Sequence, residues 1–321
     1  MAEEIDFSLF RKPENKNLRD TRHRKPKTQC KKLHAFYPWV GGKFFIKGWL
    51  STQTPSEYKT YFEPFLGAGS LFLELKPQKA VINDLNPYLP LMFYCVKSHL
   101  RMFTAQLDLL VTSLDRLGGP GFEQGLKRFN TNAKEARNKI PSNFSIAREN
   151  VEELVSRAAL FFYLLKRCHN GNISLLADGT IKCSYWKARQ HMKLYNPALL
   201  QAIHNYMDNA DIRIFHGDFS KILKLCKKGD FVYMDPPYYG SQMKSTLWAY
   251  DSKPMDHELL IAQAHRLTES GVHFAMTNNY VQDVVDQFQD YNIIHMRNVR
   301  GWSQCEKGPL KRSDMLVTNY G

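Results

Sequence analysis

The residues best suited to chemistry lie in the stretch Phe231-Val-Tyr-Met-Asp-Pro-Pro-Tyr238. An apolar run of strand length ends at Asp235, and Pro236 and Pro237 stop the strand because proline has a fixed φ and no N–H. The carboxylate is therefore held by a stiff turn. Asp235 and the Pro236 carbonyl can accept the two hydrogens of a planar amino group while Tyr238 stacks on its ring. The alternative is a Pro-Pro strand terminator before a surface turn.

A second candidate site follows a strand predicted at residues 60–63. Gly67 and Gly69 form a Gly-x-Gly turn before a helix, at the end of a strand where open α/β sheets hold ligands. The next predicted strand, residues 80–86, delivers Asp84 at the distance where such folds place an acid on ribose hydroxyls. Asn86 is a second ribose candidate. The alternatives are a dinucleotide site, although the spacing is not Gly-x-Gly-x-x-Gly, and a turn cap at Asp84.

Three motifs together resemble one family. The Asp-Pro-Pro-Tyr motif at residues 235–238 resembles the signature of the amino-methyltransferases in its DNA-adenine form. The run Trp39-Val-Gly-Gly-Lys43 is similar to the cofactor-contact segment of the Dam-like, or D12-class, adenine methyltransferases. Phe65-Leu-Gly-Ala-Gly69 is similar to their S-adenosylmethionine (AdoMet) motif. The resemblance spans about residues 34–321, in the motif order of the α group.

This resemblance implies AdoMet as the cofactor and assigns roles residue by residue. Catalysis would fall to Asp235, Pro236, Pro237 and Tyr238. Asp218, followed by Phe219, would accept a hydrogen bond from the adenine of AdoMet. The implied cofactor-binding residues are Trp39, Gly42, Lys43, Glu63, Phe65, Gly67, Gly69, Asp84, Asn86, Asp218, Phe219 and Asp235.

Residues from about 90 to 205 interrupt the α/β alternation with helical patterns. A helix predicted at 146–166 is followed by a hairpin turn at Asp178-Gly179. This stretch resembles the target-recognition lobe of the family. We expect its polar and basic residues to contact DNA, the alternative being a solvated charged surface. The candidates are Lys166, Arg167, Asn170, Asn172, Ser174, Lys182, Lys187 and Arg189.

The hairpin departs from the family in the residues that would read bases. Dam enzymes that act on GATC carry a Leu after Asn-Gly and, two residues on, an Arg suited to guanine. Here those positions are Asn172 and Ser174, and Ser184 and Trp186 replace a family Pro and Gly. We therefore expect that GATC is not the preferred target, and that the target is either a different short adenine-containing sequence or a very relaxed one. The polar Asn172 and Ser174 and the basic loop favour the relaxed option.

The composition bounds the partners. A net charge of +13 and a pI near 9.3 favour a polyanion such as double-stranded DNA, although a merely basic protein is the alternative. Six scattered cysteines without a Cys-x-x-Cys pair predict neither a metal site nor a disulfide framework. No apolar run approaches the ~18 residues of a membrane span. We expect a cytoplasmic protein of a bacterium or of a phage- or virus-infected cell, or a nuclear one in a eukaryotic host.

Residues 1–33 predict a disordered basic N-terminal arm. From Arg11 to Lys32 the chain carries ten Lys and Arg residues against Glu14 and Asp20. The arm would contact DNA phosphates, act as a nuclear-localisation patch around residues 22–27, or serve only as a solvating tail.

The expected fold is α/β: a Rossmann-like, AdoMet-dependent methyltransferase sheet with an inserted, largely helical target-recognition lobe. The catalytic domain would comprise residues 34–95 and 206–321, and the recognition domain residues 96–205. Further strands are predicted at 212–219, 231–234 and 272–277, a helix at 257–270, and a closing hairpin from 293–300 and 313–320. Residues 240–253 read as a mobile loop over the site.

The predicted function is transfer of a methyl group from AdoMet to N6 of an adenine flipped out of duplex DNA. The alternatives are the same chemistry on RNA or on cytosine N4, and a catalytically idle DNA-binding protein with this fold. The sequence does not indicate the oligomeric state.

Overall fold

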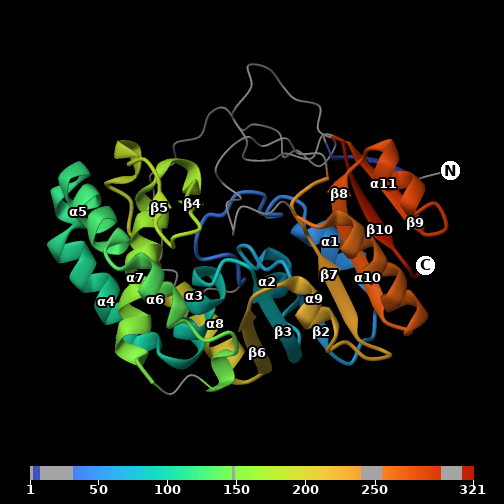
Figure 1. The fold of residues 1–321 in the computed structure, drawn as a ribbon, viewed down its shortest axis with the longest axis horizontal. Helices are drawn as coiled ribbons and strands as arrows, with labels where there is room; N and C mark the ends of the chain where they lie inside the picture. Colours follow the sequence, from blue (N-terminus) through green and yellow to red (C-terminus); the bar gives the residue numbers. More distant parts are fainter. Residues whose placement is uncertain (1–2, 8–31, 147–148, 240–254, 298–312) are drawn as a thin grey trace, which may run out of the picture.

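The computed structural model describes residues 3–7, 32–146, 149–239, 255–297 and 313–321, and shows an α/β fold (Figure 1). Its centre is an eight-stranded sheet in the order β1-β9-β10-β8-β7-β2-β3-β6. The strands are β1 (Glu3–Asp6), β2 (Tyr61–Glu63), β3 (Lys79–Asp84), β6 (Asp211–His216), β7 (Phe231–Met234), β8 (His273–Asn279), β9 (Asn292–Arg297) and β10 (Ser313–Thr318).

The sheet is mostly parallel. β6, β3, β2, β7 and β8 run parallel as neighbours, and β10 lies antiparallel between β8 and β9. From β2 the chain moves outward through β3 to β6, then returns to the other side of β2 as β7. The reversal between β2 and β7 is the point at which open α/β sheets bind ligands, beyond the carboxyl ends of the strands. The expected sheet is confirmed.

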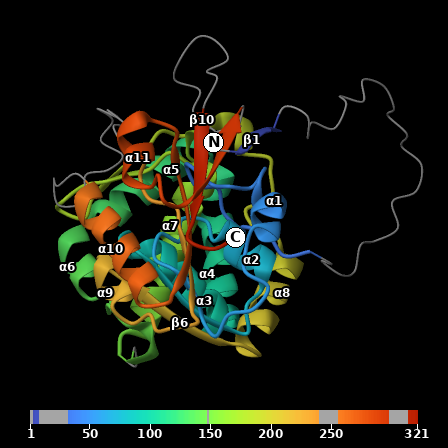
Figure 2. The same ribbon diagram turned by 90° about the vertical axis from the view of Figure 1, so that its right-hand side faces the viewer.

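Both faces of the sheet are buried, which explains the continuous apolar runs in its strands. Phe231 and Tyr233 belong to one core cluster, whereas Val232 and Met234 belong to the cluster on the opposite face. Figure 2 shows α10 (His257–Glu269) and α11 (Gln282–Gln287) on one side of the sheet, and α1 (Lys47–Thr52) and α2 (Ser70–Leu75) on the other. The short α9 (Phe219–Leu223) follows β6.

A largely helical lobe lies beside the sheet, at the left of Figure 1. Its long, apolar α7 is buried along most of its length and packs against neighbouring helices. A small hairpin of β4 (Ser174–Leu175) and β5 (Ile181–Lys182) lies at the top. The helices are α3 (Tyr88–Ser98), α4 (Leu100–Ser113), α5 (Gly119–Asn130), α6 (Ala133–Asn138), α7 (Val151–Arg167) and α8 (Pro197–Asp208).

The expected domain boundaries at 95/96 and 205/206 fall inside α3 and α8. Both helices pack on each other, and α3 also contacts β3 and β6 of the sheet. The division into catalytic and recognition domains stays a prediction.

The N-terminus differs from the expected arm. Residues 3–6 form β1, paired with β9 at the edge of the sheet, and Phe7 is buried against Trp49 with ring centroids 5.1 Å apart. The sequence pattern missed this strand because one short edge strand carries little periodicity. At the other end of the arm Leu33 is buried and Lys32 pairs with Glu74 at 2.7 Å. Residues 8–31 of the arm, like the expected loop at 240–253, lie outside the described residues.

Candidate active site

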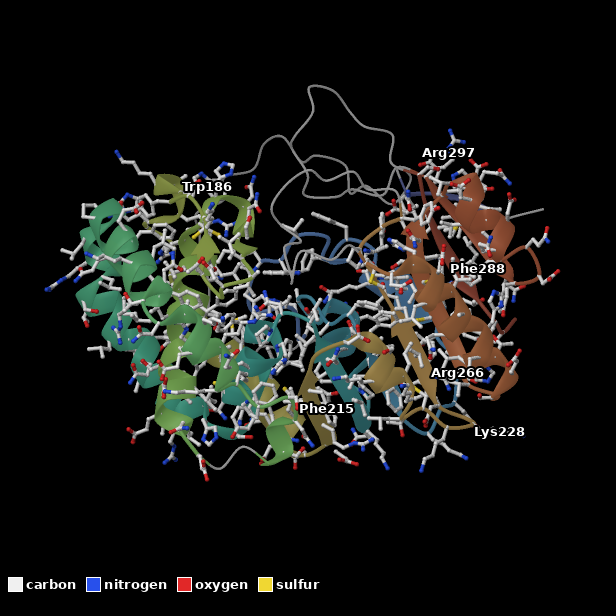
Figure 3. The ribbon with its side chains drawn as sticks, viewed as in Figure 1. Trp186, Phe215, Lys228, Arg266, Phe288 and Arg297 are labelled. Carbon is white, nitrogen blue, oxygen red and sulfur yellow. The ribbon has the colours of Figure 1, made fainter. Side chains whose placement is uncertain are left out.

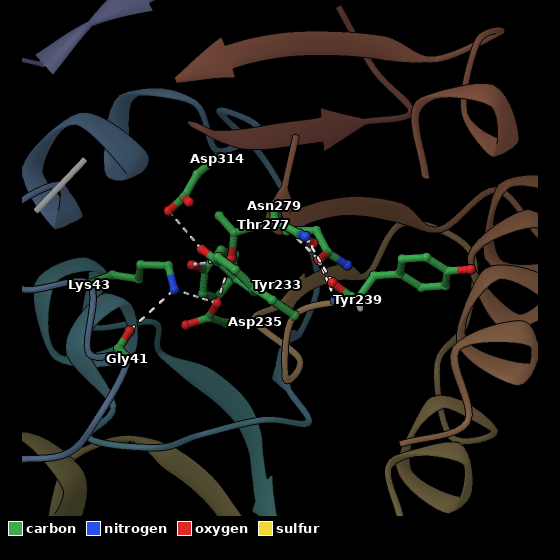
Figure 4. Close-up of polar contacts among 10 residues, drawn as sticks. Gly41, Lys43, Tyr233, Asp235, Tyr239, Thr277, Asn279 and Asp314 are labelled. Carbon is green, nitrogen blue, oxygen red and sulfur yellow. Dashed lines mark hydrogen bonds and ion pairs between the residues drawn. The ribbon is translucent and has the colours of Figure 1, made fainter. Parts of the chain in front are cut away.

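The Asp235 carboxylate lies directly beyond β7, held by neighbours on two elements (Figure 4). Thr277 of β8 donates its hydroxyl to Oδ1 at 2.7 Å, and Lys43 Nζ lies 2.5 Å from the same oxygen. Lys43 Nζ also donates to the Gly41 carbonyl at 3.2 Å. The Gly42 N–H donates to the Trp39 carbonyl and closes the backbone turn here. The side chains of Lys43 and Asp235 are 9% and 19% exposed, so the ion pair is largely shielded from water.

Tyr238 presents a ring beside this pair. Its hydroxyl donates to Asp314 Oδ2 of β10 at 2.8 Å, and Lys43 Nζ lies 5.1 Å from the ring centroid. Burial, with the charges of Asp235 and Asp314, raises the pKa of Tyr238 well above its usual value, so the phenol stays a hydrogen-bond donor. A nitrogen cation therefore touches both the carboxylate and the aromatic ring.

The turn that carries these groups is fastened to β8. The Tyr239 N–H donates to Asn278 Oδ1 at 3.0 Å, and Asn279 Nδ2 donates to the Tyr239 carbonyl at 2.8 Å. Within the turn Pro236 is buried and Pro237 is partly exposed. The residues after the strand thus form a fixed turn, as the two prolines predict.

The glycine turn after β2 lies against the segment that leads to Lys43. Gly67 has φ +49°, and the Trp39 ring would lie 3.1 Å from a Cβ added there, so a side chain has no room. The Tyr37 hydroxyl donates to the Gly67 carbonyl at 2.8 Å. Gly69, also at positive φ, precedes α2.

Asp84, at the end of β3, is joined to this turn. The Gly67 N–H donates to Oδ2 and the Asn86 N–H to Oδ1, both at 2.8 Å. Burial raises the pKa of Asp84 to about 6, although these N–H groups favour its ionised form. Asn86 is only 1% exposed, and its Oδ1 accepts the Tyr88 N–H, so its side chain supports the start of α3.

Apolar side chains flank Asp84 and a second acid, Asp218. Phe65 packs on Phe219 with ring centroids 5.2 Å apart, and Asp218, beside Phe219, is exposed while its Oδ1 caps α9. Leu85, next to Asp84, is 46% exposed although it is apolar. The sequence analysis missed Leu85, whose only signal is its place beside the acid.

Glu63 is buried, and the charges of both Asp235 and Asp84 act on it. Tyr61 donates to its Oε2 at 2.7 Å, and burial, together with the charge of Asp235, raises its pKa to about 8. The carboxyl is therefore largely protonated near neutral pH.

Comparison with known proteins decides the family. Residues 39–301 match the family model described as "D12 class N6 adenine-specific DNA methyltransferase". The match includes the Trp39–Lys43 segment, the Gly67 turn and Asp235. The chain belongs to this family. It is therefore an adenine-specific DNA methyltransferase.

Individual relatives agree with the family. The Type II methyltransferase M1.LlaDCHI of Lactococcus lactis subsp. cremoris is 30% identical over 90% of this chain and 96% of its own length. The Type II methyltransferase M.MjaIII of Methanocaldococcus jannaschii is 26% identical over 90% and 99%. The DNA adenine methylase of Escherichia coli (strain K12) is 23% identical over 90% and 96%.

The described part of this methyltransferase offers neither a membrane-spanning helix nor a metal-binding cluster. None of its helices there is both long and apolar enough to cross a membrane. Nor do three or more His, Cys, Asp or Glu side chains gather there in a way that could hold a metal ion.

In the helical lobe, the structure brings three of the residues expected to contact DNA together. Asn172, Ser174 and Lys182 line one surface cavity of about 400 Å³. The expected hairpin turn at Asp178-Gly179 is confirmed, because it joins the paired strands β4 and β5. Asp178 Oδ1 accepts the Thr180 N–H within it. The other residues that line the cavity are His169, Cys183, Ser184 and Tyr185.

Arg167 is not the phosphate contact that we expected. It is 1% exposed and forms a two-bond ion pair with Asp115, at 2.5 and 2.6 Å. It also donates to the carbonyls of Arg189 and Met192. Its role is to fix the loop after β5, because a guanidinium this buried has all its contacts inside the protein.

The other basic candidates differ in exposure. Lys187 is exposed, whereas the Arg189 guanidinium lies 4.6 Å from the Trp186 ring centroid. Lys166 is partly buried 5.9 Å from the Phe162 ring, and burial lowers its pKa to about 8. Asn170 adopts a left-handed conformation in the loop before β4.

One close approach joins the helical lobe to residues 37–43, the segment that ends at Lys43. A Cβ added to Gly171 would lie 3.0 Å from the Pro38 side chain, and Gly171 has φ +69°. In the chain Pro38 lies between Tyr37 and Trp39, and both of these side chains lie against the Gly67 turn. Residues 37–43 therefore touch the recognition lobe, the glycine turn and Asp235. The sequence analysis missed Tyr37, Pro38, Thr277 and Asp314 because their partners lie far away in the chain.

Proposed function

We propose that this methyltransferase transfers the methyl group of AdoMet to N6 of an adenine that has rotated out of duplex DNA, with Asp235 and Tyr238 holding the adenine. The contact of Lys43 Nζ with the Asp235 carboxylate and the Tyr238 ring supports the proposal best. A nitrogen donor bound to Asp235 and close to the Tyr238 ring is the arrangement that an adenine amino group needs.

The second cluster fits AdoMet. Asp84 and the exposed Asp218 offer carboxylates for ribose hydroxyls and an adenine amine, and Phe65 and Leu85 offer apolar surface for the ring. The tight contact of Gly67 with Trp39 forms a backbone cradle at the switch point of the sheet. AdoMet supplies a methyl group bonded to a positively charged sulfur. Buried Glu63, between the clusters, adds a carboxyl group that can ionise beside that charge.

Asp235 would make the target nitrogen a better nucleophile. The amino lone pair of adenine is delocalised into the ring, so the amine must become pyramidal as it accepts the methyl group. Asp235, with the Pro236 carbonyl, would accept the amino hydrogens and stabilise that geometry. Thr277 and the Tyr239–Asn278 contact hold the acceptors in place, so little reorganisation is needed during the reaction.

A substrate amine that donates to Asp235 Oδ1 would take the place of Lys43, which contacts that oxygen in this structure. The base must leave the duplex because its amino group cannot reach a carboxylate at the sheet edge from within the stack.

The experiment is calorimetry with AdoMet and a methyl-transfer assay on DNA, applied to Asp84→Ala and Asp235→Ala. Asp84→Ala should weaken AdoMet binding by about 1–3 kcal/mol, the cost of losing a charged hydrogen-bond partner. Asp235→Ala should bind AdoMet yet transfer no methyl groups. The control is Asp211→Ala, which removes an exposed carboxylate at the start of β6 and should behave as wild type. Undiminished AdoMet affinity in Asp84→Ala, or methyl transfer by Asp235→Ala, would contradict the proposal.

A further inference from the structure

Two aromatic side chains follow the lysine that contacts the catalytic carboxylate. Phe44 and Phe45 are 53% and 56% exposed, and their ring centroids lie 5.6 Å apart in an edge-to-face arrangement. The next residue, Ile46, is 3% exposed, and Leu50 of α1 is 2% exposed. Ile46 and Leu50 thus anchor this segment to the core. Lys47 Nζ lies 5.5 Å from the Phe44 ring centroid, yet more than half of each phenylalanine stays exposed.

The pair is tied closely to the active site. The N–H groups of Ile46 and Lys47 donate to the Lys43 carbonyl at 3.0 and 2.8 Å, so a single tight turn holds Phe44 and Phe45 beside Lys43. Lys43 in turn contacts Asp235. The two rings are therefore carried by the same turn as the lysine that contacts Asp235.

The site faces the side of the molecule where DNA would approach. In Figure 3, Trp186 of the recognition lobe and Arg297 at the end of β9 lie on the same upper side, whereas Phe215 and Lys228 lie below. The carboxyl ends of β2 and β7 point toward that upper side in Figure 1. The net charge of +13 favours a polyanionic partner for the protein as a whole.

We propose that Phe44 and Phe45 stack against the bases beside the target adenine and so hold the duplex open. When a base leaves the stack, its neighbours lose one stacking partner, and an aromatic side chain can replace it. The inference rests on DNA as the substrate of the Asp235 site. It assigns the opening of the duplex to the segment that also carries Lys43, so that release of Asp235 and insertion of the rings involve the same turn.

The test uses Phe44→Ala/Phe45→Ala, the conservative Phe44→Tyr/Phe45→Tyr, and Phe44→Leu/Phe45→Leu in the full chain. The probe is a fluorescein-labelled duplex that carries an adenine shown to be methylated by the wild type. The alanine pair should bind it roughly tenfold more weakly. The tyrosine pair should bind as wild type and the leucine pair as the alanine pair, because stacking needs an aromatic face. The slope of log affinity against log salt should not change, since no phosphate contact is lost.

Two controls make the outcome decisive. Leu109→Ala removes a side chain of similar exposure, 54%, from α4 in the lobe and should leave DNA affinity unchanged. AdoMet affinity and melting temperature should stay at wild-type values in all pairs. Wild-type DNA affinity in the alanine pair, full affinity in the leucine pair, or a lowered melting temperature would each overturn the inference. An inactive wild type would instead contradict the proposed function.

Discussion

At the scale of residues, the site is governed by competition for one oxygen. Asp235 Oδ1 accepts from Thr277 and contacts Lys43. Thr277 fixes the carboxylate, while Lys43 is the partner that a substrate amine can replace. The ammonium shields the carboxylate until the adenine arrives, so that Asp235 is never a buried, unpaired charge.

Tyr238 should act through its ring more than through its hydroxyl. Tyr238→Ala removes the stacking surface, worth about 1–3 kcal/mol per base, and should lower kcat/KM for DNA about 5- to 150-fold. Tyr238→Phe loses only the bond to Asp314 and should keep most of the activity. Steady-state kinetics on DNA measure both. Equal losses in the two variants would show that the hydroxyl, and not the ring, carries the role.

Glu63 should give the protein a measurable pH dependence. Its folded pKa of about 8 lies above an unfolded value of about 4.3, so the folded state binds the extra proton in between. This group should lower the free energy of unfolding by about 1.4 kcal/mol per unit as the pH rises through that window. Glu63→Gln should lack the decline. Urea denaturation from pH 5 to pH 8 should show the variant gaining on wild type, and parallel curves would contradict the prediction.

At the scale of elements, the loop after β5 depends on the Arg167–Asp115 pair. Arg167→Met leaves Asp115 without its partner and should destabilise the protein by about 3–5 kcal/mol. Where this variant still binds DNA, the slope of log affinity against log salt should equal that of the wild type. Lys187→Ala, at an exposed position of the same loop, should keep the stability and reduce the slope by about one. Urea denaturation and salt titrations separate the two, and a reduced slope in Arg167→Met would restore Arg167 as a phosphate contact.

The Pro38–Gly171 contact should couple the two halves of the molecule. Gly171→Ala would push against Pro38 and should weaken AdoMet binding, although Gly171 belongs to the recognition lobe. Gly179→Ala strains the hairpin turn similarly, at φ +81° and 2.8 Å from the Ala133 carbonyl, without touching Pro38. Calorimetry should therefore find reduced AdoMet affinity only in Gly171→Ala. Equal affinities in both variants would remove the coupling.

These elements show what the sequence could predict. β7 and its Pro-Pro turn were foreseeable because two-sided burial leaves an unbroken apolar run and proline ends it. The burial of Arg167 was not, because its partner Asp115 lies 52 residues away and no local pattern reports that distance. β1 was not foreseeable because its four residues carry little periodicity and its partner β9 lies near the other end of the chain.

At the scale of the whole molecule, the helical lobe lies beside the sheet with its β4–β5 hairpin at the top of Figure 1, and Pro38 of residues 37–43 lies close to Gly171 of the lobe. Ser174, which lines the same cavity as Asn172, is too short for the two-bond contact that an Arg makes with guanine. Loss of such a contact removes about 1–3 kcal/mol of discrimination. The expectation that GATC is not the preferred target therefore stays a prediction, with relaxed specificity as the favoured form.

The most direct measurement is sequencing that detects methylated bases on unmethylated plasmid DNA after incubation with AdoMet and either the wild type or Asp235→Ala. We predict N6-methyladenine at adenines that are not restricted to GATC with the wild type, and none with Asp235→Ala. Equal methylation by the variant would contradict the role of Asp235, N4-methylcytosine would contradict the adenine assignment, and methylation confined to GATC would contradict the account of the hairpin.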